Sequence, residues 1–320
     1  MAVATHLSRR GLLAAAVPVL GLAAAGCSGG SPRRRLTLAS GPAGGPYAIF
    51  GQRLAEAVHR RDDKLSVRVV LTSASVENLH MLGSGGADLA MSLGDSAADA
   101  VVGLGPFSGG RLPVTALARV YLNYTHLVVL GGSPIRKVAD LAGRRVSLGA
   151  AGSGTAVIGE RVLAVAGLAR PVRPVKLGLD ESVAALEAKE IDAFFWSGGV
   201  PTAAIAALAG REPIRLIPLD GLARPLRKAN GPTYVGVSVP ASTYRQLAEV
   251  PTVGVPSYLM ARAALPNDVA YEVTRAMFQY RDRLPGPESP GSYLDERYAI
   301  GTGTVPLHPG AVRYYRSVYG

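Results

Sequence analysis

The chain has 320 residues, 48% of them hydrophobic and 18% charged, with a formal net charge of +11. This length can bury a sizeable core and is enough for two domains. The basic residues are spread along the chain and form no aromatic-rich basic face, so the charge does not indicate a nucleic-acid-binding protein. A mild positive field suits an acidic solute or an anionic surface nearby.

The amino terminus has the pattern of a secretion signal. Arg9 and Arg10 precede an uncharged stretch, 11–26, which is short for a membrane span and ends at Cys27. The small residues before Cys27, the only cysteine, resemble a lipobox, although Ala24 stands where leucine is usual. This resemblance implies that Cys27 is lipidated and becomes the first residue of the mature protein.

These signals predict a location on the extracytoplasmic face of the cell membrane. We expect residues 1–27 to be a lipoprotein signal peptide and 28–35 to be a flexible tether. The paired arginines also resemble a twin-arginine export signal. Release of a soluble protein after simple cleavage, and an uncleaved anchor, remain alternatives.

Apolar periodicity beyond the tether predicts alternating strands and helices. The predicted strands are 36–40, 66–72, 89–92, 127–130, 145–148, 193–196, 214–218 and 253–260. The predicted helices are 48–60, 76–82, 155–166, 181–188, 200–209 and 268–284. This alternation favours an α/β fold with parallel sheets whose faces are covered by helices.

The loop Gly149–Thr155 joins a predicted strand to a predicted helix. Ser153 or Thr155 can serve as the N-cap, so backbone N–H groups and the positive end of the helix dipole point to one place. Such a place suits a carboxylate or a phosphate. The glycines match no nucleotide-binding fingerprint, and a tight turn that needs glycine for its backbone alone is the alternative interpretation.

This loop and four other segments occur in an order and spacing that resemble the TAXI family, the solute receptors of one branch of TRAP transporters. The segments are 44–51, 75–95, 140–155, 191–201 and 306–315. The resemblance covers the chain from about Leu36 to Gly320. It implies a bilobed fold of the type II periplasmic-binding-protein kind, in which two α/β lobes are joined by a hinge of two crossings.

We expect the crossings at 124–130 and 251–260, because both are apolar runs flanked by glycine or proline. Lobe one would then comprise 36–127 plus 253–320, and lobe two 128–252. Solute would bind in the cleft between them, where loops at the carboxyl ends of strands converge.

Nine residues are candidates for contact with the solute. They are Gly45, Tyr47, Asn78, Asp95, Ser153, Gly154, Thr155, Trp196 and Gly199. Tyr47 offers a hydroxyl and an aromatic face, and Ser153, Gly154 and Thr155 would grip a carboxylate. Trp196 and Gly199 would form the opposing wall.

Each candidate also has a purely structural interpretation. Tyr47 and Trp196 could fill the core, and Asn78 could cap a helix or lie exposed. Asp95, which matches an aspartate of the family pattern, could hold an amino group of the solute or cap the next helix. Pro46 and Ala48 replace a threonine and a tyrosine usual in the family, which leaves the family's usual solute open.

The resemblance implies a monomeric receptor that captures a small carboxylate, such as an amino acid or dicarboxylate, and delivers it to TRAP-type membrane permease subunits. Presentation of the loaded receptor to a membrane sensor kinase is the alternative. The five histidines have no metal-ligand spacing, and no Gly-x-Ser-x-Gly elbow occurs. We therefore expect no enzyme, catalytic residue, metal or cofactor, and a secreted hydrolase is the least favoured interpretation.

Overall fold

A computed structural model of the protein describes residues 34–246, 248–284 and 294–320. The predicted signal peptide, the lipidation site at Cys27 and most of the predicted tether lie outside the described residues. The first strand begins at Arg34, two residues before its predicted start.

The strands of the described chain form one sheet, in the order β2-β1-β3-β10-β4-β7-β5-β6, with β8 added to β4 and β9 to β10. The strands are β1 (Arg34–Ala39), β2 (Leu65–Val70), β3 (Leu89–Leu93), β4 (Val114–Leu130), β5 (Arg145–Ser147), β6 (Arg173–Val175), β7 (Ala193–Gly198), β8 (Ile214–Leu216), β9 (Val235–Val239) and β10 (Val250–Arg262). We call β2, β1 and β3 the first half of the sheet and β7, β5 and β6 the second half.

Two long strands, β4 and β10, connect the halves. They run antiparallel to each other; β10 pairs with β3, and β4 pairs with β7. Both predicted crossings lie within these strands. The prediction of parallel sheets is therefore only partly right: strands are parallel within each half, and the sheet is mixed because the chain leaves the first half along β4 and returns along β10. The lobe boundaries at 127 and 253 remain a prediction.

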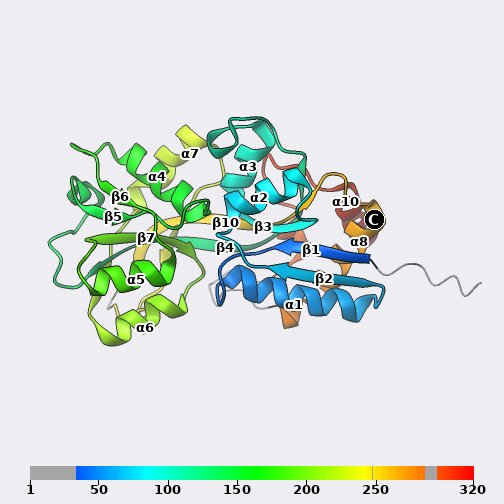
Figure 1. Ribbon diagram of the computed structural model, residues 1–320, viewed down its shortest axis with the longest axis horizontal. Coiled ribbons are helices and arrows are strands. Elements are labelled where there is room, and N and C mark those ends of the chain that lie inside the picture. Colours follow the sequence, from blue (N-terminus) through cyan, green and yellow to red (C-terminus); the bar gives the residue numbers. More distant parts are fainter. Residues whose placement is uncertain (1–33, 247, 285–293) are drawn as a thin grey trace, which may run out of the picture. The chain divides into compact units, whose positions relative to one another are not determined.

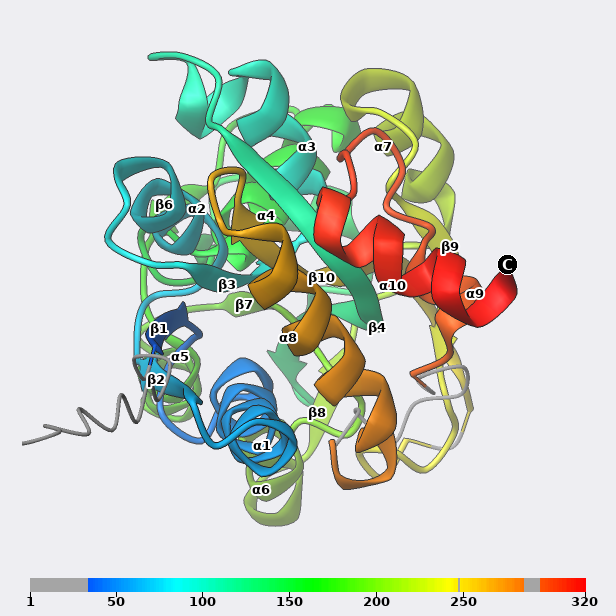
Figure 2. The same ribbon diagram turned by 90° about the vertical axis from the view of Figure 1, so that its right-hand side faces the viewer.

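Helices cover both faces of the sheet. They are α1 (Pro46–Arg61), α2 (Ser75–Ser84), α3 (Gly94–Val102), α4 (Gly154–Ala166), α5 (Leu179–Glu187), α6 (Ala203–Arg211), α7 (Ala223–Asn230), α8 (Asn267–Gln279), α9 (Glu296–Ala299) and α10 (Pro309–Tyr319). Figure 1 shows α2, α3, α4 and α7 above the sheet and α1, α5 and α6 below it. The carboxyl-terminal helix α10 packs against α8, which also contacts α1 (Figure 2).

Apolar side chains fill the space between each helix layer and the sheet. In the first half, Phe50 and Leu54 of α1 pack with Leu259 of β10. In the second half, Ile158 and Val162 of α4 pack against the sheet. These clusters stabilise the elements whose ends meet at the middle of the molecule.

Candidate functional site

The glycine-rich loop leads into α4 as predicted. Ser153 is the N-cap: its Oγ accepts a hydrogen bond from the Ala156 N–H at 3.1 Å and donates one to the Ala150 carbonyl at 2.7 Å. The N-cap prediction is therefore confirmed for Ser153, whose hydroxyl is occupied by the helix it caps. The next two N–H groups, of Gly154 and Thr155, have no partner within the helix because the first turn offers none.

Polar side chains and helix starts gather where β4, β7 and β10 pass between the starts of α1, α2 and α4. Hydrogen bonds, cross-strand pairing, close packing or a shared face of one strand relate these residues to one another. We call this set the polar ring: Tyr47, Ser75, Asn123, Thr125, Gly154, Thr155, Ser197 and Ser257.

Tyr47 and Ser257 form one side of the polar ring. The Tyr47 hydroxyl shares a hydrogen bond of 2.8 Å with Ser257 Oγ, which also accepts from the Asn123 amide. Burial raises the pKa of the Tyr47 phenol well above its usual value, so the hydroxyl stays protonated. The Tyr47 ring packs in the core of the first half, with 9% of its surface exposed.

Thr125 and Ser197 form the opposite side. They are directly paired across β4 and β7, and the Ser197 N–H donates to Thr155 Oγ1 at 3.2 Å. Residues two apart on a strand share a face, so Ser197 lies on the same face as Phe195. Phe195 packs in the cluster under α4, and this face therefore presents Ser197 to the start of that helix.

The starts of α2 and α4 close the polar ring. A Cβ atom added to Gly154 would lie 2.6 Å from Ser75 Oγ, so only glycine permits this approach. Beside it, the Gly152 carbonyl accepts hydrogen bonds from the N–H groups of Val76 and Glu77, both at 3.1 Å. The loop before α4 thereby caps α2, and these contacts join the two halves of the sheet.

Three buried hydroxyls in this region lack a hydrogen-bond partner among the described residues. They belong to Tyr121, Thr125 and Ser197, of which Thr125 and Ser197 are in the polar ring. Their residues are 3%, 1% and 9% exposed. Buried polar atoms are normally paired, and one that is not calls for a functional or structural explanation.

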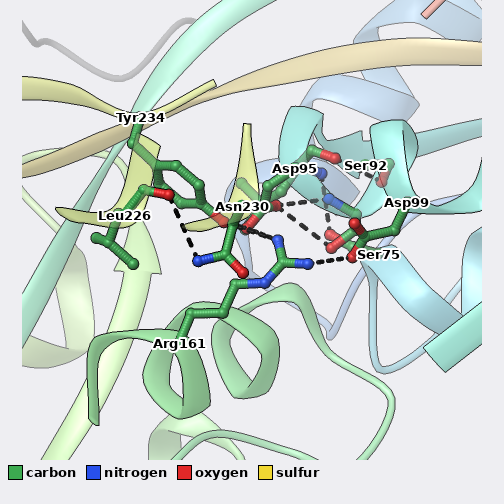
Figure 3. Close-up of polar contacts among 10 residues, drawn as sticks. Ser75, Ser92, Asp95, Asp99, Arg161, Leu226, Asn230 and Tyr234 are labelled. Carbon is green, nitrogen blue, oxygen red and sulfur yellow. Dashed lines mark hydrogen bonds and ion pairs between the residues drawn. The ribbon is translucent and has the colours of Figure 1, made fainter. Parts of the chain in front are cut away.

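A buried charge network lies beside the polar ring, between α3 and α4 (Figure 3). Arg161 of α4 forms ion pairs with Asp95, at 3.4 Å, and with Asp99, both of α3. The Tyr234 hydroxyl donates to Asp95 Oδ2 at 2.9 Å and lies 2.7 Å from Arg161 Nη1. Burial raises the pKa of Asp99 above its usual value, although Arg161 opposes the shift.

Asp95 is thus surrounded by protein groups. Its Oδ2 contacts Tyr234 and Arg161, and its Oδ1 accepts the Ser96 N–H at 2.7 Å. The N-cap of α3 is Leu93, so Asp95 lies in the first turn and is not the cap. An acid in this turn interacts favourably with the helix dipole.

Asn78 lies in the core and not in the polar ring. Its amide donates to the carbonyls of Ser40, at 2.6 Å, and Met91, at 2.8 Å, and its oxygen accepts from Thr72 at 2.6 Å. These bonds tie the residue after β1 and the middle of β3 to α2. Gly45 is the N-cap of α1, two residues before Tyr47, and its N–H donates to the Pro42 carbonyl.

Trp196 points to the other face of β7 from Ser197, where it packs with the cluster that includes Phe194. Its indole N–H donates to Thr202 Oγ1 at 3.0 Å, and that hydroxyl donates to the Gly199 carbonyl at 2.6 Å. The structure therefore brings together Tyr47, Gly154 and Thr155 of the predicted residues, with Gly45 and Ser153 adjacent, and places Trp196 elsewhere.

Polar residues inside the two long strands were not predicted as site residues. Tyr121, Asn123 and Thr125 occupy alternate positions of β4. Ser257 interrupts the apolar run of β10. Polar side chains at alternate positions of an otherwise apolar strand are the signal that could have identified them.

Among the residues that the structure describes, no group of three or more His, Cys, Asp or Glu side chains is placed to hold a metal ion. Over the same residues, no helix combines the length and hydropathy that a membrane span requires.

Comparison with known proteins identifies the fold and the family. The alkanesulfonate-binding protein SsuA from Xanthomonas axonopodis pv. citri, solved with MOPS, is 19% identical, with a TM-score of 0.50 over 89% of this chain and 84% of that one. XAC2383 from Xanthomonas citri, solved with ATP, is 16% identical, with a TM-score of 0.52 over 89% and 95%. These similarities confirm the predicted type II periplasmic-binding-protein-like fold. The model of the NMT1-like family matches residues 38–318, and the chain belongs to that family.

Proposed function

We propose that the protein is an extracytoplasmic solute-binding receptor that captures a small carboxylate between the two halves of its sheet. The observation that carries this proposal is the polar ring with the buried, unpartnered hydroxyls of Thr125 and Ser197 beside the start of α4. Hydroxyls and free helix N–H groups at one place supply the donors that bind a carboxylate.

The structural neighbours support binding and not catalysis. One is named a binding protein for alkanesulfonates, and the other was solved with ATP. Sulfonates and phosphates resemble carboxylates in presenting several anionic oxygens. No metal group and no nucleophile with an orienting base is present among the described residues of the site, which favours a receptor over a hydrolase.

In this receptor Tyr47, Asn123 and Ser257 would contact the solute from one side, and Gly154, Thr155 and Ser197 from the other. Lobe one would comprise 36–127 plus 253–320, and lobe two 128–252. The contacts between Gly152 and the start of α2 would open and close as the solute leaves and enters.

The five segments that resemble the TAXI family support delivery of the solute to TRAP-type permease subunits. Lipidation of Cys27 would hold the receptor at the membrane beside that partner. We expect Cys27→Ser to abolish the partitioning of the exported protein into detergent. Equal partitioning of variant and wild type would contradict the anchor and leave the receptor function intact.

Thermal unfolding with a panel of small carboxylates tests the binding function. A solute at about one hundred times its dissociation constant should stabilise the protein by about 2.7 kcal/mol and raise Tm by a few degrees. Mass spectrometry of molecules that copurify with the exported protein widens the search. A sugar or a metal ion that raises Tm while no carboxylate does would refute the proposal.

A further inference from the structure

We infer that the carboxylate bound at the polar ring carries a hydroxyl or keto oxygen and no amino group, as in a 2-hydroxy or 2-oxo acid. This inference rests on the proposed function and narrows its solute class. An amino acid would need a protein carboxylate for its ammonium group, and the structure already commits the nearby carboxylates to other partners.

No side chain of the polar ring is ionised. Its groups are hydroxyls, one amide and the backbone at the start of α4. The only acidic proton is that of the Tyr47 phenol, whose pKa is raised by burial, so this group stays neutral. The ammonium group of an amino acid would find acceptors here but no protein carboxylate, and burial of a charged group without such a partner is unfavourable.

Asp95 is the first candidate to bind an ammonium group of the solute, because its charge acts on Tyr47. Both of its oxygens are occupied, by the Ser96 N–H on one side and by Tyr234 and Arg161 on the other. Asp99, on the next turn of α3, is paired with the same arginine. An amino group that approached either acid would compete with Arg161 for it.

The same network engages the arginine of α4, the helix whose start belongs to the polar ring. Arg161 pairs with two carboxylates and is not free to bind a third. Arg119 stands opposite Tyr258 in the β4–β10 register, beyond Tyr121, and is not a member of the polar ring. The solute carboxylate would therefore be held by the N–H groups of Gly154 and Thr155 and by neighbouring hydroxyls.

The positive end of α4 also disfavours an amine. Helix N-termini attract anions and repel cations, and α1 and α2 begin at the polar ring as well. The Thr125 and Ser197 hydroxyls, by contrast, can each donate or accept a hydrogen bond. A hydroxyl or keto oxygen of the solute satisfies either one without adding charge.

Matched solute pairs that differ only at this group test the inference. L-Lactate is compared with L-alanine, and L-malate with L-aspartate, by calorimetric titration of the purified chain. We expect the hydroxy acid of at least one pair to bind about tenfold or more tightly than its amino partner. An amino acid that binds as tightly as its hydroxy partner overturns the inference but supports the receptor function. Failure of all four acids contradicts the inference, and it contradicts the receptor function as well if no carboxylate of the thermal panel raises Tm.

Two variants test whether the preference for a hydroxy acid arises at the polar ring. Thr125→Val and Ser197→Ala should each weaken binding of the preferred hydroxy acid about tenfold. Thr274→Val is the matched control, because Thr274 is equally buried but donates to the Ala270 carbonyl within α8. Unchanged affinity in both ring variants, with folding intact by circular dichroism, would contradict the assignment.

Discussion

At the residue scale, Tyr47 packs in the core, as one of its two sequence interpretations held, and its hydroxyl belongs to the polar ring. The centroid of its ring lies 6.2 Å from that of Tyr121, whose own centroid lies 6.0 Å from that of Phe50. The Tyr47 hydroxyl, at the other end of the side chain, contacts Ser257. A sequence can indicate that a tyrosine follows a glycine-rich turn. It cannot indicate that the ring lies in the core and the hydroxyl in the polar ring, because this depends on strands far away in the chain.

The two roles of Tyr47 separate in two substitutions. Tyr47→Ala should lower the unfolding free energy of the empty protein by about 3–5 kcal/mol, because it leaves a cavity in the core. Tyr47→Phe keeps the ring and should cost about 0.5–1.5 kcal/mol, the net contribution of one hydrogen bond. Urea unfolding of both variants measures the difference, and equal losses would show that the ring contributes little.

His126 should make stability depend on pH. Its residue is 1% exposed, and burial lowers the pKa of the imidazole from 6.5 to about 4. The folded state therefore binds fewer protons than the unfolded state between these values. The neutral imidazole of His126 therefore makes its full contribution to the unfolding free energy above pH 6.5. This contribution, about 3 kcal/mol, is lost as the pH falls toward 4.

A variant without this imidazole isolates its contribution. His126→Gln should flatten the decline in unfolding free energy between pH 6.5 and pH 4, as measured by urea titration. The unfolding free energy of the variant should still fall with pH, but less steeply, because burial also lowers the pKa of His308. Identical pH profiles for wild type and variant would mean that His126 can be protonated without unfolding.

At the scale of elements, helices were predicted well where the apolar periodicity agrees with the residues that mark helix starts. The helices α1, α2 and α4 were predicted to within two residues at every end, because glycine, proline or serine marks their starts and apolar spacing marks their lengths. The helix α3 was not among the predicted helices because it begins directly after β3 with Gly94, Asp95 and Ser96, which have low helix propensity. The helix α7 was missed because Pro225 interrupts the pattern, although proline is tolerated in a first turn.

The long strand β4 was predicted to start at Leu127 but begins at Val114. Much of the strand is buried on both faces, so its sequence does not alternate between apolar and polar residues. Its buried polar residues, among them Asn123 and His126, further obscure the strand pattern. The sheet's central pairing was therefore beyond prediction from periodicity.

The close approach of α2 and α4 predicts opposite effects for two glycines. Gly154→Ala places a Cβ 2.6 Å from both Leu93 Cδ1 and Ser75 Oγ and should destabilise the protein by about 1–3 kcal/mol. Gly210→Ala in α6 meets only the end of Arg245 at 4.0 Å and should stabilise by up to about 1 kcal/mol. Chemical unfolding compares them, and stabilisation by Gly154→Ala would show that the helix ends are not in contact.

At the scale of the whole molecule, the chain's two halves are joined by more than the strands that pass between them. The sequence motifs predicted the fold and the meeting of loops at its middle, and the structural neighbours confirm the fold. They did not predict the charge network, because Arg161 is one of 34 basic residues and nothing in its local sequence distinguishes it. Its partners are 62 and 66 positions away along the chain.

Because this network is buried, removing its single cation should be costly. Arg161→Met leaves the carboxylates of Asp95 and Asp99 without their ion pairs and should lower the unfolding free energy by about 3–5 kcal/mol. A triple variant that also carries Asp95→Asn and Asp99→Asn removes the charges together and should recover part of this loss, since a buried ion pair replaced as a unit is often nearly neutral. Urea unfolding at low ionic strength gives both values. If the triple variant is less stable than Arg161→Met, the two aspartates stabilise the protein through contacts other than Arg161, and the network does not act as one unit.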